Sequence, residues 1–131
     1  MTSPVIAVRD ATYDDIVFVL SSWKANYWDV HAKHYVRWQN YKLGMPALIN
    51  RLLGRSAVPV AFSPDVPSEI FGWACIEHGV CHYVYTKSCY RRQGIGRGLV
   101  RGCDRYTHWT GPLGKKFAEE VGMQFDPFLV F

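Results

Sequence analysis

The order of apolar and polar positions predicts helices in the first part of the chain and strands in the middle. A short β-type run covers 5–8. Thr12 and Asp15 then have the spacing of a helix capping box. Apolar residues at helical spacing follow them and predict a first helix at about 12–25.

The next segment, 27–53, is aromatic and basic and predicts one or two further helices, broken near Gly44-Met45-Pro46. The run 58–62 is strand-like. Because proline cannot donate to a ladder of hydrogen bonds, Pro59 must lie at a sheet edge or at the start of the strand.

The clearest β signal is a pair of strand-like runs, 70–77 and 80–86, joined by His78-Gly79. A two-residue turn that ends in glycine predicts an antiparallel hairpin. A glycine-rich turn and a helix at about 94–105 follow.

The last part of the chain predicts a short strand at 106–109 and a helix that opens at Gly111-Pro112 and ends before Gly122. A terminal strand, interrupted by proline, is expected at 125–131. Only nine residues follow Gly122, so the C-terminal strands are expected to be short.

Composition favours one soluble globular domain over the whole chain, 1–131. The chain has 131 residues, of which 49% are hydrophobic and 20% charged. Its apolar runs fall far short of the roughly 20 residues that span a bilayer, and no basic stretch precedes an apolar run at the N-terminus. The four cysteines form no CxxC pair, which favours reduced thiols and a cytoplasmic location.

The positive charge is concentrated in one segment. Between Lys87 and Arg105 lie six basic residues and one acidic residue, a net charge of +5, whereas the whole chain carries +4. The rest of the chain therefore carries a net charge of about −1. This distribution favours a local anionic ligand over a broad nucleic-acid surface, with a solvated helix face as the alternative.

The glycine-rich turn between strand and helix is typical of a pyrophosphate site. Backbone N–H groups converge there, and the helix dipole adds positive charge. Gly94 and Gly96 let phosphates approach the main chain, and Arg91, Arg92 and Arg97 can add charge-assisted contacts. The sequence contains neither a P-loop motif nor the dinucleotide fingerprint GxGxxG, and the turn follows a hairpin.

The run Tyr90 to Val100, YRRQGIGRGLV, resembles the acyl-CoA signature [QR]xxGx[GA] of the GNAT superfamily of N-acyltransferases. Arg91, Gly94 and Gly96 fill its defined positions. The order of predicted elements is similar to that family over nearly the whole chain. The resemblance implies an α/β (α+β) fold with a mixed, mostly antiparallel sheet flanked by helices.

The resemblance also implies an activity, the transfer of an acetyl group from acetyl-CoA (coenzyme A) to an amine by direct attack. Amides of the turn would hold the pyrophosphate, and the second hairpin strand would pair with the pantetheine arm. The implied cofactor-binding residues are Val84, Tyr85, Thr86, Arg91, Arg92, Gln93, Gly94, Ile95, Gly96 and Arg97.

A base is needed because the attacking amine must be neutral. With His78-Gly79 as the turn, Glu77 is expected opposite Val80, and Cys75 opposite His82. The residues that would then share one face are Glu77, Cys75, His82, Val84 and Thr86. We interpret His82 as the catalytic base, oriented by Glu77; the alternative is an ordinary hydrogen-bonded strand histidine beside a solvated hairpin end.

The sequence departs from the family at the closing helix. Ala118 stands where the family commonly has the tyrosine that protonates the departing thiolate. Four tyrosines are candidate substitutes, or the thiolate leaves unassisted: Tyr83, Tyr85, Tyr90 and Tyr106. The shortened end would leave a sheet edge that favours a homodimer.

The remaining motifs leave alternatives open. His31 and His34 have helical spacing but no complete ligand set, so they are interpreted as helix-surface residues and no metal site is expected. The resemblance implies that the first helices line the acceptor site, so the aromatic residues of 23–41 would bind a small-molecule or macromolecular amine or stack on a base; the alternative is core packing. Two other functions remain: a CoA-binding regulatory module with weak catalysis, and a modifier of nucleic acid or protein. No membrane partner is expected.

Overall fold

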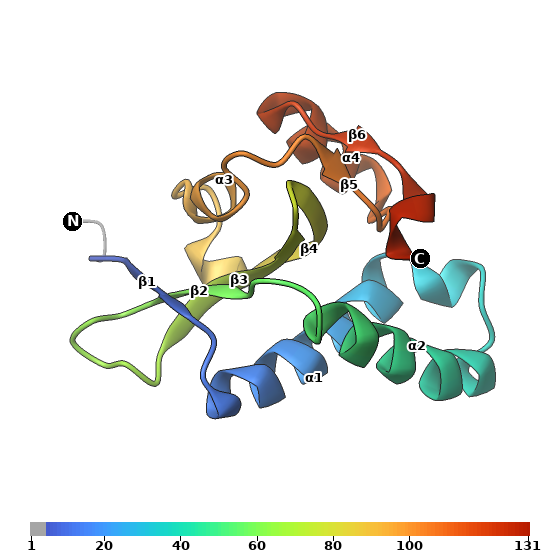
Figure 1. Ribbon diagram of the computed structural model, residues 1–131, viewed down its shortest axis with the longest axis horizontal. Helices are drawn as coiled ribbons and strands as arrows, with labels where there is room; N and C mark the ends of the chain where they lie inside the picture. The colour runs from blue at the N-terminus through green and yellow to red at the C-terminus, as the bar shows by residue number, and fades with distance from the viewer. Residues whose placement is uncertain (1–4) are drawn as a thin grey trace.

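The computed structural model describes residues 5–131 and contains a six-stranded sheet covered by helices on both faces (Figure 1). The strands are β1 (Ala7–Asp10), β2 (Pro59–Phe62), β3 (Ile70–Glu77), β4 (Val80–Thr86), β5 (Arg105–Tyr106) and β6 (Gln124–Phe125). The helices are α1 (Tyr13–Val30), α2 (Trp38–Leu53), α3 (Ile95–Leu99) and α4 (Gly111–Val121). Short 3-10 turns cover Ala32–His34, Ser88–Tyr90 and Pro127–Val130.

The strands follow one another in chain order across the sheet. β1 to β4 are antiparallel, whereas β5 runs parallel to β4 and β6 parallel to β5. The predicted mixed, mostly antiparallel sheet with shortened C-terminal strands is therefore confirmed. Pro59 opens β2, which lies between β1 and β3, so of its two predicted positions the strand start is the right one.

Helix α1 begins as its capping box predicts. The Asp15 N–H donates to Thr12 Oγ1, and the Thr12 N–H donates to Asp15 Oδ2. The predicted break near Gly44-Met45-Pro46 is wrong, because α2 runs through it. The chain breaks earlier, at His31, whose backbone dihedrals (φ −148°, ψ −62°) are not helical. Pro46 is tolerated because the carbonyl it leaves unbonded, that of Lys42, belongs to an exposed residue where water can donate.

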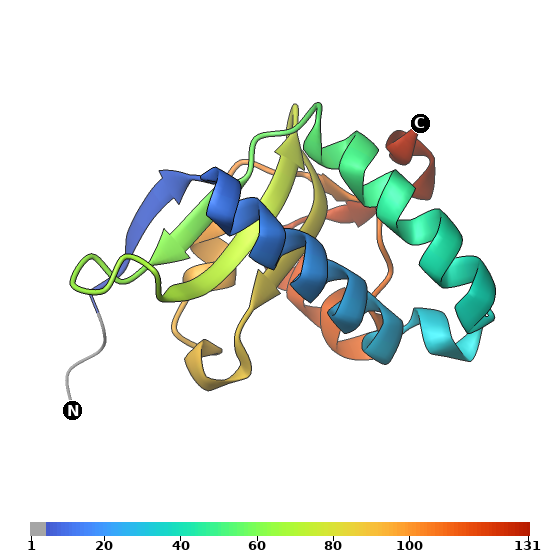
Figure 2. The same ribbon diagram turned by 90° about the horizontal axis from the view of Figure 1, so that it is seen from below.

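Two apolar clusters fill the two sides of the sheet. Figure 2 shows α1 and α2 lying side by side across one face, where Val19, Trp23, Ile49 and Trp73 are fully buried. The other cluster packs α3 and α4 on the opposite face. The sheet is therefore packed between helices on both faces. It is open between β4 and β5, beyond the short stretch where these two strands pair.

The register of the β3–β4 hairpin shifts by one residue at a β-bulge. Glu77 pairs with Val80 as predicted, but Cys75 pairs with Tyr83 and not with His82. The expected shared face is therefore wrong: Cys75 packs in the cluster under α1 and α2, whereas Val84 packs against the other cluster. A bulge adds one unpaired residue and re-aims its side chain. This extra residue is His82.

β4 and β5 separate directly after the bulge. They pair only through Val80 with Arg105 and Cys81 with Tyr106. Within residues 5–131, no strand pairs with β4 on this side from His82 onward. The backbone of this part of β4 consequently has one unpaired edge.

Two C-terminal predictions were too long. The helix expected at 94–105 ends at Leu99, because Gly96 and Gly98 weaken it and Gly102 (φ +89°) turns the chain away. The strand expected at 125–131 is limited to Gln124–Phe125, after which a 3-10 turn begins at Pro127.

Two Gly→Ala substitutions are expected to change stability in opposite directions. A Cβ at Gly72 would lie 2.5 Å from the backbone oxygen of Tyr85, so Gly72→Ala should lower the free energy of unfolding by about 1–3 kcal/mol. Gly44 lies inside α2 with open space around it, so Gly44→Ala should raise that free energy by about 0.5–1 kcal/mol. Urea unfolding measures both. Equal midpoints for Gly72→Ala and the parent protein would contradict the close approach of β3 and β4.

Candidate functional site

The turn between β4 and α3 presents a run of backbone N–H groups with no protein acceptor. Among residues 5–131, no hydrogen bond is donated by the amides of Arg92 to Arg97. The first amide of α3 that is bonded within the helix is that of Gly98, which donates to the Gly94 carbonyl at 2.9 Å. Unbonded amides at the start of a helix favour an anion. Since α3 has only five residues, its dipole is small, and the amides themselves are the main donors.

The backbone of this turn is held in an uncommon conformation. Gly94 (φ +78°) and Arg92 (φ +65°) both lie in the left-handed region. Arginine rarely adopts this region, and such residues concentrate at binding sites. Left-handed residues alternating with right-handed ones turn successive N–H groups toward one concave side, where an anion can bind.

The predicted cofactor residues lie close together around this turn. A Cβ at Gly96 would lie 3.5 Å from Thr86 Oγ1 and 3.4 Å from the Phe117 ring, so β4, α3 and α4 meet at this point. Arg91 donates from Nε to the Thr86 carbonyl at 3.2 Å. Arg97 lies 3.8 Å from Glu120 across an exposed gap. Gln93 and Ile95 belong to the same turn, whereas Val84 and Tyr85 lie on β4 beside its unpaired edge.

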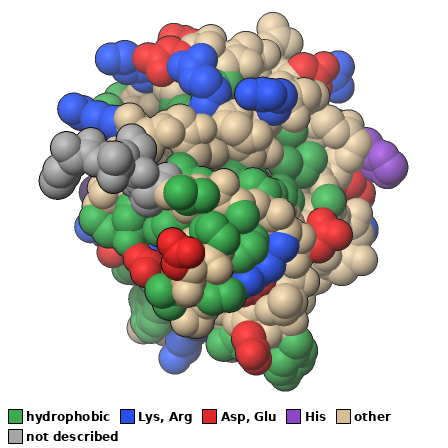
Figure 3. All heavy atoms as spheres, turned by 90° about the vertical axis from the view of Figure 1, so that its left-hand side faces the viewer, with side chains coloured by type: hydrophobic (Ala, Val, Ile, Leu, Met, Phe, Trp, Pro, Cys, Tyr) green, Lys and Arg blue, Asp and Glu red, His purple; other side chains and the backbone are tan. Residues whose placement is uncertain are grey.

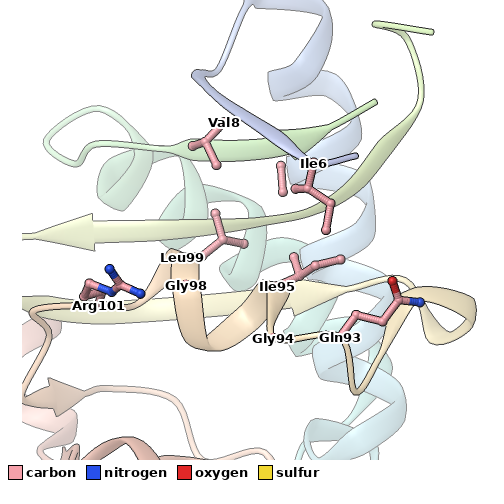
Figure 4. Close-up of a pocket in the computed structure, with 9 residues that line it drawn as sticks. Ile6, Val8, Gln93, Gly94, Ile95, Gly98, Leu99 and Arg101 are labelled. Carbon is pink, nitrogen blue, oxygen red and sulfur yellow. The ribbon is translucent and has the colours of Figure 1, made fainter. Parts of the chain in front are cut away.

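A shallow apolar groove adjoins the turn and is lined in part by Gln93, Gly94 and Ile95. Its volume is about 320 Å³, and it lies between the β1–β2 edge and α3 (Figure 4). Hydrophobic side chains gather on this face of the molecule (Figure 3), where Val5 and Val8 are exposed. The residues that line it are Ile6, Val8, Ala61, Gln93, Gly94, Ile95, Gly98, Leu99 and Arg101. The groove lies on the α3 face of the sheet and is separate from the His82 side chain.

His82 lies at the centre of a hydrogen-bonded network. Its side chain is buried, its Nε2 is 2.9 Å from Glu77 Oε1 and its Nδ1 is 3.0 Å from Thr107 Oγ1. Thr107 Oγ1 is in turn 2.9 Å from His108 Nδ1. The predicted contact between Glu77 and His82 is confirmed, because the bulge turns His82 toward the hairpin end.

Arg55 fixes the outer end of the network. Its Nε donates to Glu77 Oε1 at 2.9 Å, and its Nη2 donates to the Val130 carbonyl at 2.7 Å. The hydrogen bond from His82, together with Arg55, holds the pKa of Glu77 below its usual value despite partial burial. Glu77 is therefore a carboxylate at neutral pH.

The two histidines are neutral at the same pH. Burial lowers the pKa of His82, and the Glu77 carboxylate opposes this effect. Burial also lowers the pKa of His108 to about 4, an effect that His82 reinforces and that the His82 backbone opposes. A neutral imidazole has a lone pair to accept a proton, so both rings are in the form that a base requires.

Sequence reasoning missed Arg55, Thr107 and His108. Nothing in the pattern around Arg55 indicates its partner, which lies 22 residues away. Thr107 and His108 carry a weak signal: they follow a short strand, and a strand parallel to β4 brings the residues after it beside His82. That register is not readable from the sequence.

Two of the four candidate tyrosines have hydroxyl groups that are already bonded. Tyr83 Oη donates to Asn26 Oδ1 at 2.5 Å, and Tyr90 Oη donates to Glu69. Tyr106 is 9% exposed and packs in the cluster under α3 and α4. Ala118 is buried in the same cluster, so the position where the family commonly has a tyrosine offers no hydroxyl to the departing thiolate.

The cysteines are poor nucleophiles where they are buried. Burial raises the pKa of the Cys75 thiol to about 11, and it also holds the pKa of the Cys81 thiol well above its usual value. A thiolate is the reactive form, so these two side chains act as small apolar groups.

In the part of the chain that the structure describes, no three His, Cys, Asp or Glu residues gather as metal ligands. None of the helices in 5–131 is long and apolar enough to cross a bilayer.

Comparisons with known proteins identify the fold. No protein-family model matches the sequence, and no curated protein matches it. Among solved structures, a possible acetyltransferase from Clostridium difficile 630 matches with a TM-score of 0.60 at 15% identity over 93% of this chain and 91% of its own.

Two further structures have the same arrangement. A GCN5-related N-acetyltransferase from Rhodopseudomonas palustris, also titled a class-II aminotransferase, matches with a TM-score of 0.53 at 13% identity over 96% of this chain and 75% of its own. The aminoglycoside N-acetyltransferase AAC(6')-Iy, in complex with CoA, matches with a TM-score of 0.50 at 14% identity over 94% of this chain and 90% of its own. At these identities the likeness identifies the architecture, and the chain has the GNAT fold.

Proposed function

We propose that this protein transfers an acetyl group from acetyl-CoA to an amine. The observation that carries the proposal is the turn of six consecutive unbonded amides, Arg92 to Arg97, at the position of the acyl-CoA signature. Such a turn suits the pyrophosphate of CoA, whose two phosphates need several N–H donors at close range. Arg91 and Arg92 add positive charge at the same place.

The unpaired edge of β4 suits the pantetheine arm. The amide groups of the pantetheine arm could form hydrogen bonds with the backbone of Val84, Tyr85 and Thr86, as the backbone of an added strand would. This path leads from the turn toward the point where β4 and β5 separate, next to His82 and Thr107. The thioester would then lie beside the network that ends at Glu77.

The acceptor amine is proposed to approach from the side of α1. The His108 ring packs edge-on against Trp23 and Tyr27, with ring centroids 5.6 and 5.1 Å away. The structure with CoA is titled an aminoglycoside N-acetyltransferase, which supports an amine acceptor for this chain. Trp23 is fully buried, so the partly exposed Tyr27 is the ring of this pair that can face a cationic amine.

A second candidate is a CoA-binding module with little turnover. The observation that favours it is Ala118, which offers no proton to the departing thiolate and is buried in the core. Nucleic-acid modification is less well supported, because Trp23 and Tyr41 are buried in the core and cannot stack on bases. A homodimer and a cytoplasmic location stay predictions.

Turnover separates the two candidates. The intact protein is incubated with radiolabelled acetyl-CoA and a panel of arylalkylamines, polyamines, aminoglycosides and lysine peptides, and transfer of label to the amine is measured. We expect at least one amine to be acetylated faster than in buffer. Tight binding of CoA without any acetylated product would contradict the proposed enzyme activity and support the CoA-binding regulatory module.

A further inference from the structure

His82 cannot contact an acceptor directly. It is 1% exposed, and its two ring nitrogens are bonded to Glu77 and to Thr107. A general base needs a free lone pair within hydrogen-bonding reach of the proton that it removes. Any proton that reaches His82 from the α1 side has to pass through Thr107.

The donors and acceptors of the network have one consistent order. A carboxylate only accepts, so the His82 Nε2–H donates to Glu77 and leaves Nδ1 with a lone pair. The Thr107 hydroxyl then donates its one hydrogen to His82 Nδ1. His108 must consequently donate its Nδ1–H to Thr107 Oγ1. This arrangement leaves the lone pair of His108 on Nε2.

His108 is 7% exposed, so a small part of its ring reaches solvent. Its Nε2 atom makes no hydrogen bond to any group within residues 5–131. Over the same residues, the side-chain polar atoms that are both fully buried and unpartnered are Trp23 Nε1 and Ser56 Oγ. His108 Nε2 is not among these fully buried atoms, which agrees with the small exposed part of the residue. His108 is the second residue after β5, just beyond the point where the pairing of β5 with β4 ends.

We propose that, in the acetyl transfer proposed above, His108 is the base that faces the acceptor amine, and that Thr107, His82 and Glu77 carry its proton to solvent. As the amine nitrogen bonds to the acetyl carbon and the C–S bond breaks, the amine proton passes to His108 Nε2. The His108 Nδ1 proton moves to Thr107 Oγ1, and the Thr107 hydroxyl proton moves to His82 Nδ1.

The last transfer takes the His82 Nε2 proton to the Glu77 carboxylate. The Glu77 side chain is 21% exposed and releases this proton to water. The CoA thiolate that leaves takes a proton from water, so the products are an amide and the CoA thiol. His108 is the catalytic residue, and Thr107 and His82 are positioning residues that act through it.

The first test reads the network without catalysis. NMR of the intact protein labelled with ¹⁵N in its histidines reports which ring nitrogen carries the hydrogen. We expect Nε2–H for His82 and Nδ1–H for His108. Thr107→Ser, which keeps the hydroxyl, should preserve both tautomers, whereas Thr107→Val should change at least one. Nε2–H on His108 in the parent protein would overturn the proposal.

The second test measures turnover with an amine that the parent protein acetylates. His108→Gln should lower kcat by about 10²–10⁴-fold with unchanged affinity for CoA. Since the residues form one relay, His82→Gln combined with His108→Gln should lose no more than His108→Gln alone. Thr107→Val should lose kcat, and Thr107→Ser should recover it to within about threefold. Urea unfolding confirms that each variant is folded.

The two tests separate failure of the relay from failure of the proposed function. Parent-like kcat in His108→Gln, or losses that multiply in the double variant, would overturn the relay. The expected tautomers in a protein that binds CoA but acetylates no amine would overturn the acetyl transfer on which the relay rests.

Discussion

Gly94→Glu is expected to weaken the binding of CoA and acetyl-CoA by at least about 100-fold, since like charge beside a bound anion costs several kcal/mol. Gly94 has open space around it, so the new side chain does not clash. Its φ of +78° adds a backbone cost of about 1–2 kcal/mol. The main effect is electrostatic, because a carboxylate would lie beside the unbonded amides of Arg92 to Arg97. Isothermal titration calorimetry measures the loss.

Gly98→Glu is the matched control. Gly98 is also an exposed glycine with open space around it, and the charge change is the same. Its N–H is already bonded to the Gly94 carbonyl, so it offers no donor to a phosphate. We expect affinity within about threefold of the parent protein, a difference below about 1 kcal/mol. Equal losses in the two variants would mean that overall charge, and not the turn, determines CoA affinity.

Glu77→Gln is expected to lower kcat for acetyl transfer by about 100-fold or more, with little change in the affinity for CoA. The carbonyl of the substituted side chain can still accept the hydrogen bond from His82, so the packing is kept. An amide does not take up a proton, however, and the substitution removes the charge that Arg55 and His82 share. Steady-state kinetics with an accepted amine measures kcat.

Glu119→Gln controls for the loss of one carboxylate. Glu119 is exposed on α4 and pairs only loosely with Lys115, at 3.8 Å. Exposed pairs of this kind contribute little to stability, and this one lies outside the network. Its kcat should equal that of the parent protein. A Glu77→Gln variant as active as Glu119→Gln would remove Glu77 from the mechanism.

Much of the fold was predictable because local signals agree with the tertiary structure. The capping box at Thr12 begins α1, the His78-Gly79 turn joins β3 to β4, and Gly122 (φ +80°) ends α4. The break expected near Gly44-Met45-Pro46 does not occur, because the carbonyl that Pro46 leaves unbonded belongs to the exposed Lys42. Helix α3 was overestimated because its glycines limit it to five residues.

The candidate site was predictable only as far as it is local in sequence. The turn around Gly94 is one continuous segment, and its glycines and arginines mark it directly. The network around His82 depends on a one-residue bulge and on the parallel register of β5, neither of which has a sequence signal. The alternation of side chains along the two strands, taken without the bulge, placed Cys75 opposite His82. It gave no indication that Thr107 contacts His82.

Calorimetric titration of the intact, folded protein with acetyl-CoA and with CoA tests directly whether the turn at Gly94 is a cofactor site. We expect saturable binding of both ligands at one site per chain, with a micromolar dissociation constant, about −8 kcal/mol. Absence of binding by either ligand would contradict this expectation. The turn at Gly94 would then be a strand-to-helix connection only, and the acetyl transfer proposed here would fail with it.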